Sequence, residues 1–163
     1  HRHLYACHLH QPVRTGGGMS QLMQTFAALR ETKDYTGIIE IIPYAKFLGV
    51  QFEETAEGEL RFCLPYAERN IGNVLMPALH GGVIGGFLEN AGLVQLMWVR
   101  ESLEPPKVVD ISFDYLRPAK PQTLYAQCEL TKQGRRVANL LIEAWQEDRS
   151  KPIAVARAHF LLS

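Results

Sequence analysis

Residues 77–99 read PALHGGVIGGFLENAGLVQLMWV and hold the longest run of helical spacing in the chain. Their apolar side chains recur every three or four residues, which predicts a helix over residues 83–100 with one apolar face. That face consists of Val83, Ile84, Phe87, Leu88, Ala91, Val94 and Trp98. Pro105 and Pro106 follow and stop the helix. A helix with such a face has to be buried against another layer of structure.

The segments on either side of this helix predict an antiparallel sheet. Helical spacing also occurs in residues 20–32, with Ser20 as N-cap, and in a shorter piece over 44–48. Strand patterns occupy residues 50–54, 59–66, 109–115, 124–130, 137–145 and 153–162. The strands of the first pair and those after the helix are joined by short turns, so they form antiparallel neighbours. This order predicts an α+β fold whose sheet has one face covered by the long helix.

Composition limits the classes of function. The 163 residues include 17 Lys and Arg and 17 Asp and Glu, so the formal net charge is zero. This balance argues against a basic nucleic-acid surface and against an electrostatic membrane anchor. Cys7, Cys63 and Cys128 lie far apart and form no metal-binding pattern, which predicts buried, reduced thiols in the cytoplasm and no metal cofactor. No run of apolar residues is long enough to predict a membrane span.

The first 18 residues differ from the rest of the chain. They read HRHLYACHLHQPVRTGGG and hold four of the six histidines. Three glycines form a flexible spacer before Met19. We therefore expect residues 1–18 to be an expression-vector leader and residues 19–163 to be a single domain. A metal-binding tail is the alternative, because clustered histidines can hold a metal ion.

Candidate chemistry lies at the start of the long helix. His80-Gly81-Gly82 leads into the first turn, where backbone N–H groups have no partner within the helix. Such groups at the positive end of the helix dipole can bind an anion or stabilise an oxyanion. A simple turn that carries a histidine is the alternative interpretation.

Glu89 adds a carboxylate to this helix. On a helical wheel it shares a face with Gly82, Gly85, Gly86 and Gly92, which we call the glycine face. Glycine inside a helix costs roughly 1 kcal/mol, so the sequence indicates that something has to pack closely there. Glu89 is then either a carboxylate that projects into an acyl-group tunnel or a solvated side chain beside a tight helix crossing.

These residues resemble a known family. His80-Gly81-Gly82 with an acid nine residues after the histidine, the run DISFDYLRPA over 110–119, and QGRRVA over 133–138 resemble the PaaI-like hotdog-fold acyl-CoA thioesterases. The resemblance covers residues 43–162. It implies a curved antiparallel sheet wrapped around one long central helix, assembled as a homodimer and often as a dimer of dimers. The helix predicted from spacing over residues 20–32 adds an N-terminal helix to this fold.

The resemblance also implies a reaction and a site. The reaction is hydrolysis of an acyl-CoA thioester with no cofactor besides the coenzyme A of the substrate. Gly81 matches the glycine whose N–H polarises the thioester carbonyl, beside His80. Glu89 matches the carboxylate that attacks the carbonyl or activates water.

The chain departs from the family pattern at two places. The family often has Asn or Gln six residues before the histidine, where this chain has Val74, with Asn73 one residue earlier as the candidate replacement. Val108-Val109 stands where the family often has Ser or Thr.

The substrate's phosphates need cations or N–H groups. Gly82, Arg117, Arg135 and Arg136 are the candidate substrate-binding residues by the resemblance.

Two other functions remain open at the level of the sequence. An acyl-CoA-binding hotdog protein with little turnover fits the apolar Val74 and Val108. A hotdog hydratase or dehydratase also pairs a histidine with a helix carboxylate, but the Asp-x-Asn-Pro-x-His run of the MaoC-type hydratases is missing.

Spacing predicts that the site is shared between two chains. Gly81 and Glu89 lie eight residues apart, about 12 Å along a helix. One thioester carbon cannot contact both groups of one helix, whereas a two-fold dimer can bring Gly81 of one chain to Glu89 of the other.

Overall fold

The structure is a computed structural model that describes residues 18–163. The predicted leader, residues 1–18, lies outside the described residues except for Gly18. The helices are α1 (Gln21–Glu31), α2 (Tyr35–Glu40), α3 (Pro43–Leu48), the short 3₁₀ helix η1 (Glu68–Asn70) and α4 (Gly81–Val99). The strands are β1 (Gln51–Glu54), β2 (Leu60–Leu64), β3 (Ile71–Asn73), β4 (Ala78–Leu79), β5 (Lys107–Tyr115), β6 (Leu124–Gln133), β7 (Val137–Trp145) and β8 (Ala154–Leu161).

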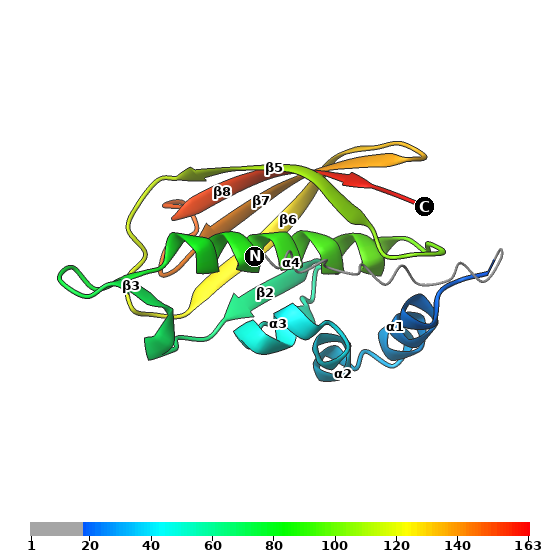
Figure 1. The fold of residues 1–163 in the computed structure, drawn as a ribbon, viewed down its shortest axis with the longest axis horizontal. Helices are drawn as coiled ribbons and strands as arrows, with labels where there is room; N and C mark the ends of the chain where they lie inside the picture. Colours follow the sequence, from blue (N-terminus) through cyan, green and yellow to red (C-terminus); the bar gives the residue numbers. More distant parts are fainter. Residues whose placement is uncertain (1–17) are drawn as a thin grey trace, which may run out of the picture.

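Six strands form one antiparallel sheet in the order β1-β2-β6-β7-β8-β5. The sheet curves around α4, which lies against its inner face (Figure 1). This confirms the predicted α+β class and the hotdog arrangement of a sheet around one long central helix. Strand β5 follows α4 in sequence and forms the sheet edge opposite to β1, because α4 carries the chain across the sheet. Its outer edge has no partner strand among the described residues.

Helix α4 is the centre of the hydrophobic core. Phe87, Leu88, Ala91 and Val94 have no exposed surface, in agreement with the apolar face expected from their spacing. Gly92 also faces the sheet, because a Cβ there would lie 3.0 Å from the Ile142 side chain. Gly92 therefore does not belong to the glycine face around Glu89, to which the sequence pattern assigned it.

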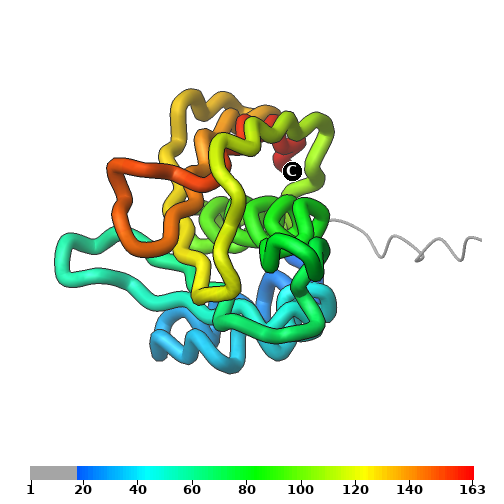
Figure 2. Tube along the Cα trace, turned by 90° about the vertical axis from the view of Figure 1, so that its left-hand side faces the viewer, coloured from blue at the N-terminus to red at the C-terminus, as the bar shows by residue number. Residues whose placement is uncertain are grey.

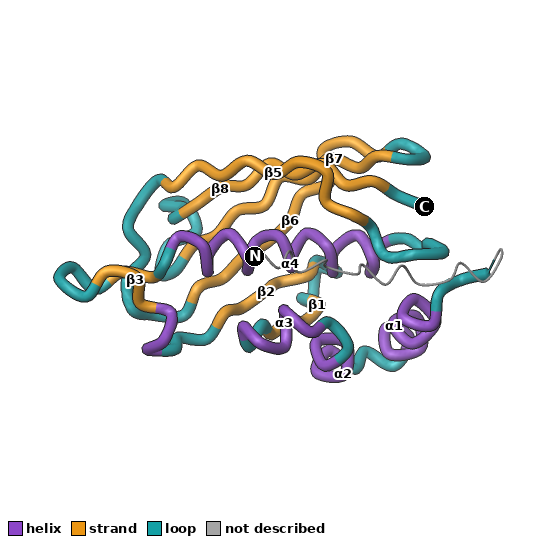
Figure 3. The backbone as a smooth tube through the Cα atoms, in the orientation of Figure 1, coloured by secondary structure: helices purple, strands orange, loops and turns teal. Residues whose placement is uncertain are grey.

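Helices α1, α2 and α3 cover the side of α4 away from β5 to β8 (Figure 3). Ser20 caps α1 as predicted, since its Oγ accepts a hydrogen bond from the Met23 N–H at 3.3 Å. Helix α2 was not predicted, because its six residues are too few to show a helical period. The short strands β3 and β4 were likewise missed and form a separate hairpin just before α4.

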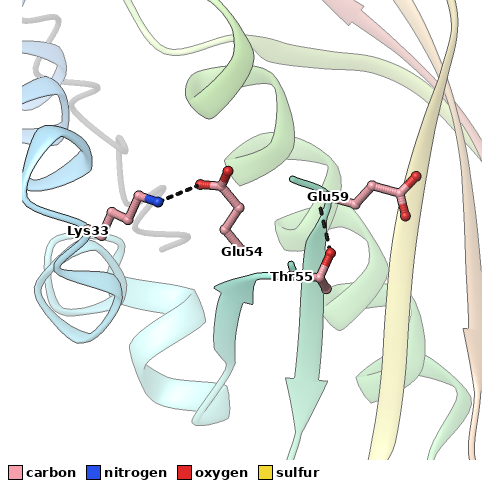
Figure 4. Close-up of polar contacts among 4 residues, drawn as sticks. All are labelled: Lys33, Glu54, Thr55 and Glu59. Carbon is pink, nitrogen blue, oxygen red and sulfur yellow. Dashed lines mark hydrogen bonds and ion pairs between the residues drawn. The ribbon is translucent and has the colours of Figure 1, made fainter. Parts of the chain in front are cut away.

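Polar contacts tie the β1–β2 hairpin to its neighbours. Lys33 Nζ pairs with Glu54 at 3.7 Å, and the Glu59 N–H donates to Thr55 Oγ1 at 3.3 Å (Figure 4). The Glu59 carboxylate also accepts a hydrogen bond from Gln127 on β6. These contacts fix the edge of the sheet opposite to β5.

The two cysteines of the described residues are free thiols. Burial raises the pKa of both Cys63 and Cys128, so they are packing residues and poor nucleophiles.

Helix α4 is long and apolar enough, by length and composition only, to cross a membrane, contrary to the sequence expectation. However, 56% of its apolar window is buried inside the fold, as in the core helix of a globular protein.

Candidate active site

The first turn of α4 leaves one backbone donor unused. His80 caps the helix, and its Nδ1 accepts a hydrogen bond from the Gly82 N–H at 2.9 Å. The N–H groups of Val83 and Ile84 donate to the His80 carbonyl oxygen at 3.1 and 3.2 Å. The Gly81 N–H has no acceptor among residues 18–163. It is therefore a donor at the positive end of the helix dipole that is available to a ligand.

His80 is held from the hairpin that precedes the helix. Its backbone N–H donates to the Asn70 carbonyl oxygen at 2.8 Å. A Cβ at Gly72 would lie 2.8 Å from the His80 Cα, so only glycine fits there without displacement. The imidazole works as a helix cap and orients the turn. The Gly82 N–H, expected to bind substrate, is already bonded to that imidazole.

Tyr115 of β5 closes the other side of the turn. Its hydroxyl donates to the Gly81 carbonyl oxygen at 2.8 Å, and its ring lies 3.6 Å from where a Gly81 Cβ would be. Tyr115 was not among the site residues predicted from the sequence. The signal that could have found it is the alternation of residues 109–115, which puts Phe113 and Tyr115 on the helix side of the strand.

Two glycines of α4 lie about one turn before Glu89, on the two sides of the glycine face. A Cβ at Gly85 would lie 3.3 Å from the Phe113 ring, and one at Gly86 would lie 3.1 Å from the Tyr44 ring. These glycines let β5 and α3 approach the helix closely. Glu89, one turn further, is half-buried and makes no hydrogen bond or ion pair within residues 18–163. The close packing inferred from the glycines is present and leaves the carboxylate without a partner.

The side of α4 between β5 and α3 is uncovered by any described segment. Figure 2 shows α4 nearly end-on, with β5 above it and the N-terminal helices below. Apolar side chains are exposed along this side: Val109 is 65% exposed and Tyr115 is 51% exposed on β5, and Tyr44 is 51% exposed on α3. An apolar surface at an unpaired strand edge is typical of an interface.

Asn73 does not reach the start of α4 in the described chain. A register irregularity does occur in β3, between Ile71 and Asn73. The Asn73 Oδ1, however, accepts hydrogen bonds from the N–H groups of Leu75 at 3.1 Å and Met76 at 3.2 Å. It therefore stabilises the β3–β4 turn, and its side chain is exposed.

The three candidate arginines lie at two ends of the molecule. Arg117 follows Tyr115, beside the start of α4, and its Nη1 donates to the Pro152 carbonyl oxygen at 2.7 Å. Arg135 and Arg136 lie in the β6–β7 turn, at the end of the sheet where β5 begins (Figure 1). The Leu162 N–H donates to the Arg136 carbonyl oxygen at 2.7 Å. One chain therefore does not bring these arginines together.

Comparison with known proteins assigns the family. Residues 76–153, which span α4 and strands β5, β6 and β7, match the thioesterase superfamily. The chain belongs to the thioesterase superfamily. Thioester hydrolysis as the reaction class is thereby confirmed, and so is the hotdog thioesterase resemblance read from residues 80–89 and 110–119.

Several known proteins are similar over most of the chain. A medium/long-chain acyl-CoA thioesterase, YigI of Salmonella typhimurium, is 28% identical over 134 residues, which are 74% of this chain and 86% of that protein. A Chromobacterium violaceum protein of known crystal structure is 60% identical with a TM-score of 0.74, over 86% of this chain and 97% of its own. A phenylacetic acid degradation-related protein from Ralstonia eutropha shares the fold at 21% identity with a TM-score of 0.69, over 84% of this chain and 98% of its own.

Other possible sites in the described residues do not compete with this one. No cluster of His, Cys, Asp and Glu within residues 18–163 is suited to hold a metal ion. A small pocket lies between α1 and the far end of α4, lined by residues that include Met23, Phe26, Met97 and Ser102. Its lining includes neither Gly81 nor Glu89, so the first turn of α4 and the glycine face remain the candidate site.

Proposed function

We propose that the protein hydrolyses acyl-CoA thioesters to a free acid and coenzyme A. The observation that carries this proposal is the Gly81 N–H, a helix-start donor with no acceptor among residues 18–163. It is supported by Glu89, a carboxylate on the same helix that has no ion pair among residues 18–163. The YigI relatives, whose name specifies medium and long acyl chains, favour acyl-CoA as the substrate.

Gly81, Glu89 and His80 each have a separate task in the proposed reaction. The thioester carbonyl oxygen accepts the Gly81 N–H, which stabilises the negative charge that develops there during attack. Glu89 either attacks the carbonyl carbon, expelling the CoA thiolate and leaving an anhydride for water to hydrolyse, or takes a proton from an attacking water. His80 keeps the Gly81 N–H pointing outward by capping the turn.

Assembly from two chains completes the site in this proposal. Gly81 and Glu89 of one helix are eight residues apart, about 12 Å, which is too far for one thioester. A two-fold axis level with Gly85, midway between them, places Gly81 of one chain opposite Glu89 of the partner subunit. The uncovered side of α4 and the unpaired edge of β5 are the surfaces that such a dimer buries.

The contacts between α4 and β5 indicate which β5 residue lies level with the proposed axis, and therefore how the β5 strands of two chains would pair. Four helical residues rise about 6 Å and two strand residues rise about 6.6 Å, so the two elements advance in step. Tyr115 contacts Gly81, and Phe113 contacts Gly85. The axis at Gly85 therefore passes near Phe113, and β5 pairs with the partner's β5 antiparallel about that residue.

The same strand register accounts for the distance between Arg117 and the pair Arg135 and Arg136 within one chain. Pairing about Phe113 brings the start of the partner's β5 alongside the residues that follow Tyr115. The β6–β7 turn lies next to the start of β5, since Lys107 pairs with Leu161 and Arg136 bonds to Leu162. Arg117 of one chain and Arg136 of the partner subunit then approach each other beside Gly81, where they supply the cations that the CoA phosphates need.

A panel of acyl-CoAs tests the proposed reaction. Straight-chain thioesters from short to long and aromatic thioesters are incubated with the protein, and released thiol is measured. We expect turnover with at least one class, and the YigI relatives favour medium to long chains. Binding of the thioesters without thiol release would support the acyl-CoA-binding alternative. This alternative is favoured by the Asn73 side chain, whose Oδ1 already accepts two hydrogen bonds within its own turn. Loss of enoyl-CoA absorbance without thiol release would support a hydratase.

A further inference from the structure

The β3–β4 hairpin projects beyond the start of α4 (Figure 1), and the side chains at its end are apolar and exposed. Val74 is 83% exposed, Leu75 is 92% exposed and Met76 is 70% exposed. We call these three residues the hairpin tip. Three consecutive large apolar side chains in water are unfavourable, by roughly 25 cal/mol for each Å² left exposed. The hairpin tip is therefore expected to be covered in the working protein.

A second apolar patch lies at the opposite end of α4. Val99 at the end of the helix and Leu103 in the following loop are 46% and 48% exposed. Val108 and Val109 at the start of β5 are 39% and 65% exposed. We call these four residues the acceptor patch. Two of its residues, Val108 and Val109, lie on β5, whose outer edge has no partner strand among the described residues, so the acceptor patch adjoins the edge that the proposed dimer buries.

The proposed two-fold axis brings the hairpin tip to the acceptor patch of the other chain. Helix α4 rises about 7.5 Å from His80 to Gly85. The five residues from His80 back to Leu75 add at most about 16 Å of extended chain. The hairpin tip thus lies up to about 24 Å from a two-fold axis that is level with Gly85. Because the partner's helix runs in the opposite direction, this distance corresponds on that helix to about 16 residues beyond Gly85, close to Val99.

We propose that the hairpin tip of each chain docks on the acceptor patch of a second copy. The inference rests on the proposed two-chain site and adds a reciprocal arm exchange to it. The base of the same hairpin holds His80, through the Asn70 carbonyl and the close approach of Gly72. Docking of the arm therefore fixes the turn that presents the Gly81 N–H to the partner subunit's Glu89.

Photo-crosslinking from the hairpin tip tests this contact. Leu75 is replaced by a benzophenone-bearing amino acid, and nitrogen-15-labelled full-length chains with that residue are mixed with unlabelled wild-type chains. We expect crosslinks between labelled and unlabelled chains that map to residues 93–109. Crosslinks within one chain, including those to residues 1–17, crosslinks to another part of the second chain, or an absence of crosslinked dimer would each overturn the proposal. The readout needs no enzymatic activity, so it stands or fails separately from thioester hydrolysis.

Dimer affinity provides a second, independent test with a matched control. Leu75→Ser makes the hairpin tip polar, while Leu130→Ser changes another exposed leucine on β6, three strands away from β5. Both positions are on the surface, so both variants should fold. We expect Leu75→Ser to weaken dimerisation at least tenfold in sedimentation equilibrium and Leu130→Ser to change it less than twofold. Equal dimer affinities for the two variants would contradict the arm exchange.

Discussion

The Tyr115 hydroxyl donates a 2.8 Å hydrogen bond to the Gly81 carbonyl oxygen. This bond joins the edge strand β5 to the first turn of α4, the two elements that the proposed dimer brings to its interface. The turn is thus held from three directions: by the His80 cap, by the hairpin base at Asn70, and by Tyr115. A rigid donor is what stabilisation of an oxyanion requires, because the donor then needs no reorganisation during the reaction.

Tyr115→Phe keeps the ring over Gly81 and removes the hydrogen bond. One such bond contributes about 0.5–1.5 kcal/mol, and with that energy lost from the transition state kcat should fall about two- to twelvefold. The melting temperature should fall by about 1–6 °C, and KM should change little, because the ring contacts remain. Tyr66→Phe, at another half-exposed tyrosine, is the control and should leave kcat unchanged. Steady-state kinetics on the best acyl-CoA of the panel decides, and equal kcat values for the two variants would remove Tyr115 from the site.

Glu89→Gln keeps the size of the side chain and removes its basicity. If Glu89 is the nucleophile or general base, kcat should fall by roughly 10²–10⁴. Glu129→Gln, at an exposed position on β6, serves as the control. Circular dichroism verifies that both variants are folded. Near-normal turnover in folded Glu89→Gln protein would show that the catalytic carboxylate lies elsewhere.

Gly72→Ala tests the base of the hairpin. A Cβ there would lie 2.8 Å from the His80 Cα, so the backbone of the capping residue has to move. We expect a loss of stability of about 1–3 kcal/mol, as for other overpacked positions, together with a lower kcat. Gly134→Ala, whose Cβ would meet nothing closer than 3.5 Å, should show neither effect. A Gly72→Ala protein with unchanged unfolding midpoint and activity would contradict the coupling between hairpin and turn.

The parts of the fold that were predictable depend on local repetition. The apolar period of α4 and the alternation in β5 to β8 are visible within single segments, and the predicted helix over 83–100 corresponds to Gly81–Val99. Helix α2 is too short for such a period. The edge position of β5 depends on contacts between strands distant in the sequence, so no local pattern encodes it.

The candidate site was predictable to a similar degree. Gly81 and Glu89 were proposed from their positions on one helix and from the family resemblance, and their catalytic roles stay predictions. The contact of Tyr115 with Gly81 joins residues 34 positions apart, and only the packing of β5 on α4 reveals it. The type and place of Asn73 suggested catalysis, and in the structure its side chain bonds to its own turn; a role for it in the reaction stays a prediction.

The shared site is the central claim, and complementation between two inactive variants tests it most directly. Glu89→Ala removes the carboxylate, and Gly81→Pro removes the N–H at a helix position that tolerates proline. Random equal mixing makes about half of the dimers mixed, each with one intact site of two, so roughly a quarter of wild-type activity should return. Mass spectrometry of the native dimers verifies that mixed dimers form. If they form and no activity returns, Gly81 and Glu89 act within one chain and the two-chain site is wrong.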